Sequence, residues 1–186
     1  MPKLPSRKSI RLKGYDYSSA GAYFITACVK DKRNILGQIV GRDVLIAPPL
    51  NDVPYVKLSQ YGEVVEKHIN KINLLNDVVL VDKHVVMPNH IHMIIKIAQH
   101  ESRFCKEGST SEAQNSGAMR TSRPTSVSVS SIIRSFKTMV TKELGFSLWQ
   151  PSFHDRIIRD EADYQRIWQY IDENPVNWQN DDYYMA

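Results

Sequence analysis

The feature that most constrains the fold is a pair of apolar runs separated by two residues. Residues 78–87 (VVLVDKHVVM) and 90–97 (HIHMIIKI) are rich in β-branched side chains, and Pro88 and Asn89 lie between them. Such side chains favour strands, and a proline followed by an asparagine favours a tight turn. The sequence therefore predicts a β-hairpin within an antiparallel sheet.

The periodicity of apolar residues predicts further elements on both sides of this hairpin. Strands are favoured by short aromatic and β-branched runs, and helices by apolar residues three or four positions apart. Ser59 is a suitable N-cap for the first helix and Gly145 a suitable end for the second. The expected strands cover 23–29 and lie within 35–46, and the expected helices cover 60–72, 128–144 and 160 to about 175.

The resulting order is strand, strand, helix, hairpin, helix, helix. It predicts an α+β fold in which helices cover one face of an antiparallel sheet and the other face can meet a ligand. The chain has 186 residues and 42% hydrophobic content, which suits one domain with a real core. We therefore expect residues 1–186 to form a single domain.

Two polar segments are expected to lie outside the regular elements. The arm 1–14 carries Lys3, Arg7, Lys8, Arg11 and Lys13 and no acidic residue, within a chain of net charge +4. It would follow a phosphate backbone or remain a solvated tail. The insert of about 99–125 lacks an apolar period and is predicted to be a mobile loop that orders on or contacts a ligand.

The cysteines and the hydropathy indicate the compartment. Cys28 and Cys105 are the only cysteines, and they are far apart, so neither a disulfide framework nor a cysteine metal site is expected. No run of apolar residues is long enough for a secretion signal or a membrane span. These observations predict a soluble cytoplasmic protein with no membrane partner.

The candidate metal ligands are His90 and His92, which begin the second strand of the hairpin. Residues two apart on a strand project to the same face, so both imidazoles point one way. Two neutral imidazoles form half of a metal site. The alternative is a pair of surface or hydrogen-bonded histidines.

The last helix supplies a candidate nucleophile. At about 100° per residue, Asp163, Tyr170 and Asn174 lie along one line, away from the apolar stripe that includes Ile167 and Ile171. Tyr170 is therefore not simply a core residue, although packing at the helix edge with its hydroxyl in water remains the alternative. Asn174 precedes a proline and has a second explanation as a helix terminator.

The motifs resemble those of the HUH-type single-tyrosine transposases, and most closely the REP-associated tyrosine transposase (RAYT) group of bacteria. The likeness runs from about Tyr15 to Trp178 and rests on GAYFITACVKDKRNILG, VVMPNHIHMII and WQPSFHDRIIRDEADYQRIWQYIDENPVNW. It implies a ferredoxin-like or RRM-like sheet, a His90 and His92 metal pair, a Tyr170 nucleophile and Asn174 as a third ligand. It also implies single-stranded DNA with hairpins, such as repetitive extragenic palindromes, as the partner, and association with the bacterial nucleoid.

This resemblance implies a defined chemistry. A phenol with a pKa near 10 is a weak nucleophile at neutral pH unless a cation offsets the developing charge. A divalent metal would do so while Tyr170 attacks the scissile phosphate, leaving a 5′-phosphotyrosine and a 3′-hydroxyl that can rejoin. Two imidazoles and an amide oxygen leave positions for phosphate oxygens and suit Mg²⁺ or Mn²⁺, although zinc would also bind.

Six basic residues are candidate phosphate contacts, each with a solvated side chain as the alternative. They are Arg11, Lys13, Arg134, Lys137, Arg156 and Arg159. Relatives include swapped dimers and monomers, so a homodimer is one possible assembly. Two other functions remain open: a catalytically silent, domesticated DNA-hairpin binding protein, and a metal-dependent phosphodiesterase that uses water in place of the tyrosine.

Overall fold

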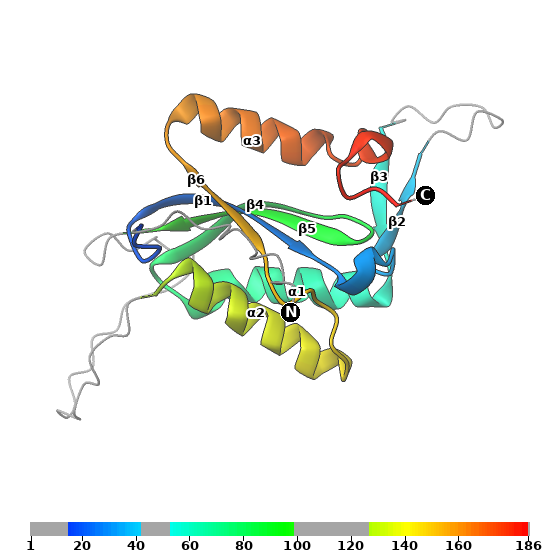
Figure 1. Ribbon diagram of the computed structural model, residues 1–186, viewed down its shortest axis with the longest axis horizontal. Helices are drawn as coiled ribbons and strands as arrows, with labels where there is room; N and C mark the ends of the chain where they lie inside the picture. Colours follow the sequence, from blue (N-terminus) through cyan, green and yellow to red (C-terminus); the bar gives the residue numbers. More distant parts are fainter. Residues whose placement is uncertain (1–14, 42–52, 99–126, 186) are drawn as a thin grey trace, which may run out of the picture.

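The main sheet has four antiparallel strands. The computed structural model describes residues 15–41, 53–98 and 127–185. Within these ranges the sheet order is β4-β5-β1-β6 (Figure 1). The strands are β1 (Gly21–Cys28), β4 (Val79–Val86), β5 (His90–Ile97) and β6 (His154–Ile158). The predicted hairpin is confirmed as β4 and β5, which pair from Val79↔Ile97 to Val86↔Ile91.

Three helices accompany the sheet, and their ends follow local sequence signals. They are α1 (Gln60–Leu75), α2 (Val129–Leu144) and α3 (Glu161–Glu173). The Ser59 side chain caps α1, and Gly145 ends α2 in the left-handed conformation with φ of 75°, as predicted. Asp160 caps α3 by accepting a hydrogen bond from the backbone N–H of Asp163.

The connectivity defines the fold class. The order β1-α1-β4-β5-α2-β6, with β1 and β5 in the centre of the sheet, is the ferredoxin-like arrangement, and α3 follows it. The expected α+β class and antiparallel sheet are confirmed. Both central strands place a buried residue at every second position in the main core, which includes Tyr23, Ile25, Met93 and Ile95.

The expectation that all helices cover one face is wrong for α3. Helices α1 and α2 pack on one face, whereas α3 lies across the other (Figure 1). Ile94 of β5 packs there with Ile167 and Ile171 of α3 in a second, smaller core. The reason is that β5 is buried on both faces: its residues Ile91, Met93 and Ile95 belong to the main core, whereas Ile94 packs under α3 between the two histidines and Lys96. The last helix therefore lies over the face that carries the two histidines.

A second, two-stranded sheet stands beside the main one. It pairs β2 (Gly37–Val40) with β3 (Tyr55–Leu58). The strand expected within 35–46 is therefore present as β2, and it pairs with β3 and not with a strand of the main sheet. Neither β3 nor β6 was expected, because β3 is only four residues long and β6 exposes polar side chains on one face.

Short 3₁₀ turns complete the described chain: η1 (Lys30–Lys32) after β1 and η2 (Trp178–Asn180) after α3. The arm 1–14, the insert 99–125 and Cys105 lie outside the described residues. Among the helices of the described part, none combines the length and apolarity that crossing a membrane requires.

Candidate active site

The two histidines project from the start of β5 into a buried site. The Pro88–Asn89 turn closes with a 2.9 Å hydrogen bond from the Met87 N–H to the His90 carbonyl. The side chains of His90 and His92 then point to the α3 face, with 0% and 1% of their surface exposed. Their Nε2 atoms lie 3.0 Å apart. The predicted pair is therefore convergent and shielded from water.

Asn89 fixes the tautomer of His90. Its Nδ2 donates to the carbonyl oxygens of Tyr183 (2.9 Å) and Lys32 (3.2 Å), so its Oδ1 must face the imidazole. That oxygen lies 2.9 Å from His90 Nδ1 and can only accept. The proton of neutral His90 is therefore on Nδ1, which leaves the Nε2 lone pair directed at His92 and available to a metal.

His92 is held by the central strand of the sheet. Its Nδ1 lies 2.8 Å from Thr26 Oγ1, and its ring stacks on Phe24 with centroids 5.1 Å apart. Both partners belong to β1, whose register sets Thr26 directly opposite His92. Rigid strands therefore fix both imidazoles, and the Nε2 of His92 faces the same point as that of His90.

The environment keeps both imidazoles neutral. Burial, with a smaller contribution from the nearby Lys32 ammonium, lowers the pKa of His90 from 6.5 to about 3. Burial also holds the pKa of His92 well below its ordinary value, with His90 as a second cause. Neutral imidazoles offer a lone pair, so both rings are able to ligate a metal at physiological pH.

The hydroxyl of Tyr170, on α3, lies beside the Nε2 atom of His92. The phenol oxygen lies 3.2 Å from His92 Nε2 and 3.3 Å from Asp181 Oδ2, and 42% of the Tyr170 surface is exposed. Burial raises the pKa of the phenol above its usual 10, and the Asp181 carboxylate raises it further. The phenol is thus protonated at neutral pH, and ionising it requires a positive charge beside it.

Asn174 lies one helical turn after Tyr170 and is 2% exposed. Its Nδ2 donates to Asp181 Oδ2 at 2.9 Å, whereas its buried Oδ1 has no hydrogen-bond partner in the described part of the chain. A buried amide oxygen without a partner is costly unless a ligand or cation satisfies it. Rotating the amide would exchange the two atoms and offer this oxygen to the site.

Asp181 belongs to the site although sequence reasoning did not select it. One of its carboxylate oxygens and one nitrogen from each of His90 and His92 lie within 4.8 Å of one another. The chain reaches it by turning back after α3, where the Asp181 N–H donates to the Trp178 carbonyl at 3.1 Å. Its only sequence signal is an acidic pair in QNDDYY, which is also typical of a solvated tail.

These donors fit a divalent cation. Two ligands bound at about 2.1 Å and at a right angle are about 3.0 Å apart, the spacing that octahedral Mg²⁺ or Mn²⁺ requires. The two Nε2 atoms lie 3.0 Å apart. Two imidazoles, a carboxylate and a spare amide oxygen form an incomplete shell with room for phosphate oxygens.

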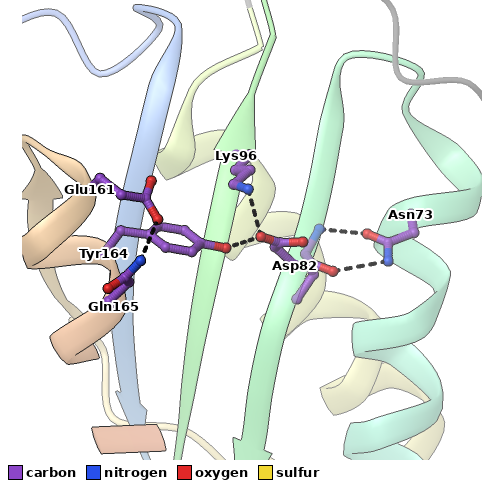
Figure 2. Close-up of polar contacts among 7 residues, drawn as sticks. Asn73, Asp82, Lys96, Glu161, Tyr164 and Gln165 are labelled. Atoms are coloured by element: carbon purple, nitrogen blue, oxygen red, sulfur yellow. Dashed lines mark hydrogen bonds and ion pairs between the residues drawn. The ribbon is translucent and has the colours of Figure 1, made fainter. Parts of the chain in front are cut away.

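The N-terminal half of α3, away from Tyr170, is attached to the sheet by the Asp82 cluster, which we define as Asp82, Lys96 and Tyr164. A β-bulge at Asp82 turns this residue and Lys83 toward α3. Asp82 Oδ2 accepts from the Tyr164 hydroxyl and from Lys96 Nζ (2.7 Å), as Figure 2 shows. Burial opposes ionisation of Asp82, but these bonds outweigh it and lower its pKa.

Two further contacts support this attachment. Lys83 pairs with Asp172 of α3, and its Nζ lies 4.7 Å from the ring centroid of Trp168. On the other side of β4, the Asn73 side chain bonds both the N–H and the carbonyl of Val81, beside the bulge (Figure 2). The bulge and its partners therefore set where α3, and with it Tyr170, lies over the histidines.

The predicted phosphate contacts divide between the two faces. Arg156 lies opposite Phe24 on the histidine side and donates to Asp163 at 2.7 Å, while Arg159 is exposed beside Lys96. Arg134 is exposed on α2, across the sheet from the site. Lys137, also on α2, donates to the carbonyls of Gln150 and Ser152. Arg11 and Lys13 fall outside the described residues.

Comparison with known structures identifies the fold. A structure of a REP-associated tyrosine transposase bound to a REP hairpin matches with a TM-score of 0.56 at 21% identity, over 90% of this chain and 74% of that one. The fold is therefore that of this class of transposase, and the expected fold is confirmed. No family model matches the chain.

A closer relative comes from Haemophilus influenzae. It is described as an uncharacterized protein and is 35% identical over 185 residues, which cover 96% of this chain and 93% of that protein. The chain belongs to the same family as this Haemophilus protein.

Proposed function

We propose that the chain nicks and rejoins single-stranded, hairpin-bearing DNA through a covalent bond to Tyr170. The observation that carries the proposal is the meeting of the Tyr170 hydroxyl, two neutral imidazole nitrogens and the Asn174 and Asp181 side chains at one point of one chain. The fold shared with a transposase that binds a REP hairpin supports hairpin DNA as the substrate class. Such a substrate implies work beside the bacterial nucleoid, in the cytoplasm.

His90, His92, Asn174 and Asp181 would hold the metal. When bound, Mg²⁺ or Mn²⁺ supplies a Lewis acid for the phosphate and offsets charge on the phenol. The strands fix the imidazoles, and α3 fixes the phenol and the amide on a rigid scaffold. Rigid positioning of the attacking oxygen lowers the entropy cost of reaching the transition state.

The chemical step needs no further reactant. The Tyr170 oxygen attacks phosphorus, and its proton passes to solvent, to which 42% of the Tyr170 surface is exposed. The bond from phosphorus to the 3′-oxygen breaks, and this oxygen leaves as a hydroxyl after taking a proton from solvent. The product is a 5′-phosphotyrosine, which a 3′-hydroxyl can attack to rejoin DNA without ATP.

A nicking assay tests the proposal. Wild-type protein incubated with Mn²⁺ and a labelled stem-loop with single-stranded flanks should form a product that survives denaturing electrophoresis and disappears on protease treatment. Tyr170→Phe should abolish this adduct. If Tyr170→Phe keeps nicking while His90→Ala loses it, water is the nucleophile. If no variant cleaves but all bind the stem-loop, the chain is a silent hairpin-binding protein.

A further inference from the structure

A large pocket opens beside the candidate active site. It has a volume of about 870 Å³ and lies between the β2–β3 ribbon and the chain that follows α3, two segments that adjoin in Figure 1. This volume lies within the range of about 300–1,000 Å³ that is usual for small-ligand pockets. The lining residues used below are Asn34, Gln38, Lys57, Trp178, Gln179 and Tyr184.

The pocket and the metal site share a wall. Trp178 lines the pocket, and its ring centroid lies 5.9 Å from that of His90 with the planes 33° apart. Pro88, which also lines the pocket, precedes Asn89, the residue that orients His90. A strand whose phosphate lay at the histidines would therefore reach the pocket with an adjacent nucleotide.

The lining matches the chemistry of an unpaired base. Tyr184 is 37% exposed and packs edge to face on Trp178, which is 8% exposed, with the ring centroids 5.4 Å and the planes 79° apart, so Tyr184 is the ring available to a base. An aromatic ring can stack on any of the four bases, because every base has a π-face. The amides of Asn34, Gln38 and Gln179 each offer donors and an acceptor, which suit the hydrogen-bonding edge of a base. Lys57 is exposed at the pocket and suits a phosphate.

We propose that this pocket holds one extruded, unpaired base of the DNA strand that carries the scissile phosphate. The inference rests on the proposed function and adds a nucleotide subsite to it. The subsite would fix the register of the strand on the enzyme, because a base held in the pocket determines which phosphate lies at the histidines and Tyr170.

Photocrosslinking tests the location directly. The probe is a stem-loop with thymidine flanks in which one flank position at a time carries 4-thiothymidine, and the protein is the full chain with Tyr170→Phe to prevent cleavage. We expect one flank position to crosslink to residues 34–41 or 176–184. Crosslinks confined to other segments in a complex that forms would overturn the proposal.

A substitution at Tyr184 tests the interaction itself. Tyr184→Ala should weaken binding of the stem-loop by about 5- to 100-fold, the usual loss for one stacked base, and Tyr184→Phe should retain binding. An abasic residue at the crosslinked position should remove the difference between wild type and Tyr184→Ala. An equal loss on intact and abasic DNA would mean that Tyr184 acts on the fold alone, which contradicts the proposal.

The control is Tyr55→Ala, because Tyr55 is 60% exposed on the same ribbon but does not line the pocket. It should bind like wild type. Failure of the subsite and failure of the proposed function give different results. If the wild type forms the Tyr170 adduct but no pocket crosslink is found, only the subsite is wrong. If it forms no adduct, the proposed function is wrong.

Discussion

The phenol oxygen of Tyr170 lies 3.2 Å from Nε2 of His92 in the same chain. The proposed nucleophile and the proposed metal ligand come from α3 and β5, which pack directly through Ile94, Ile167 and Ile171. No exchange of α3 with a second copy is needed to bring them together. A complete site within one chain is therefore the arrangement that we expect to act on DNA.

Mixing two inactive variants tests this arrangement. The Tyr170→Phe variant lacks the proposed nucleophile and the His92→Ala variant lacks a proposed metal ligand, so neither variant alone should form an adduct. If each chain uses its own tyrosine, an equal mixture should also be inactive. Recovery of about a quarter or more of the wild-type adduct in the mixture would mean that Tyr170 serves the metal of a partner chain.

Asn89 should control metal affinity without binding the metal. Its Oδ1 fixes the proton of His90 on Nδ1, at 2.9 Å. Loss of such an orienting partner typically weakens metal binding by about 10- to 100-fold. We expect Asn89→Ala to raise the Kd for Mn²⁺ in calorimetry by this factor. An unchanged Kd in a folded variant would show that the tautomer is fixed by other means.

The buried imidazoles should make the metal-free protein sensitive to acid. The pKa of His90 falls from 6.5 to about 3 on folding. Between these values the unfolded chain binds more protons, so the free energy of unfolding decreases as the pH falls below about 6.5. From pH 7 to 5 the loss from one such histidine is about 2 kcal/mol. Urea denaturation with a chelator present would measure it.

The matched control for this acid effect is His90→Asn. The variant should lose about 2 kcal/mol less than the wild type over the same pH change. If wild type and variant have the same pH dependence, His90 is not a buried neutral group and the metal site as described is wrong.

The Asp82 cluster should affect the rate of adduct formation more than metal binding. Tyr164→Phe removes the hydroxyl that bonds Asp82 and so frees the start of α3 from β4. A misplacement of the attacking oxygen by about 1 Å can slow a reaction up to about 100-fold. We expect slower single-turnover adduct formation with an unchanged Kd for Mn²⁺.

Gln165→Ala is the control for this effect, because Gln165 neighbours Tyr164 on α3 and its side chain donates to the exposed Glu161, at 3.1 Å (Figure 2). It should react at the wild-type rate. Equal rates for Tyr164→Phe and wild type would show that the cluster does not position Tyr170.

Local signals accounted for most of the fold. The hairpin and its Pro88–Asn89 turn depend on neighbouring residues, as do the caps at Ser59 and Gly145, and all of these were predicted. The position of α3 depends on tertiary packing. On the α3 side β5 carries His90, His92 and Lys96 with only Ile94 between them, a pattern typical of a strand face without a covering helix, so the position of α3 could not be predicted from it.

The site shows the same division. His90 and His92 share a face because of strand geometry, which the sequence alone predicts. Asp181 could not be predicted from spacing, because it reaches the site only after the chain turns back through η2. Lys137 illustrates the converse: a cation on a helix suggests a phosphate contact, yet here its Nζ bonds two backbone carbonyls, 2.9 and 2.7 Å away.

The most direct test of the account is the identity of the covalently bound residue. Three tyrosines, Tyr170, Tyr183 and Tyr184, fall in the peptide that trypsin releases after Arg166, so fragment ions must locate the DNA. Tandem mass spectrometry of the nuclease-trimmed adduct should find a 5′-phosphonucleotide on Tyr170. A nucleotide on Tyr183 or Tyr184, or a 3′-linked one on any tyrosine, would contradict the mechanism.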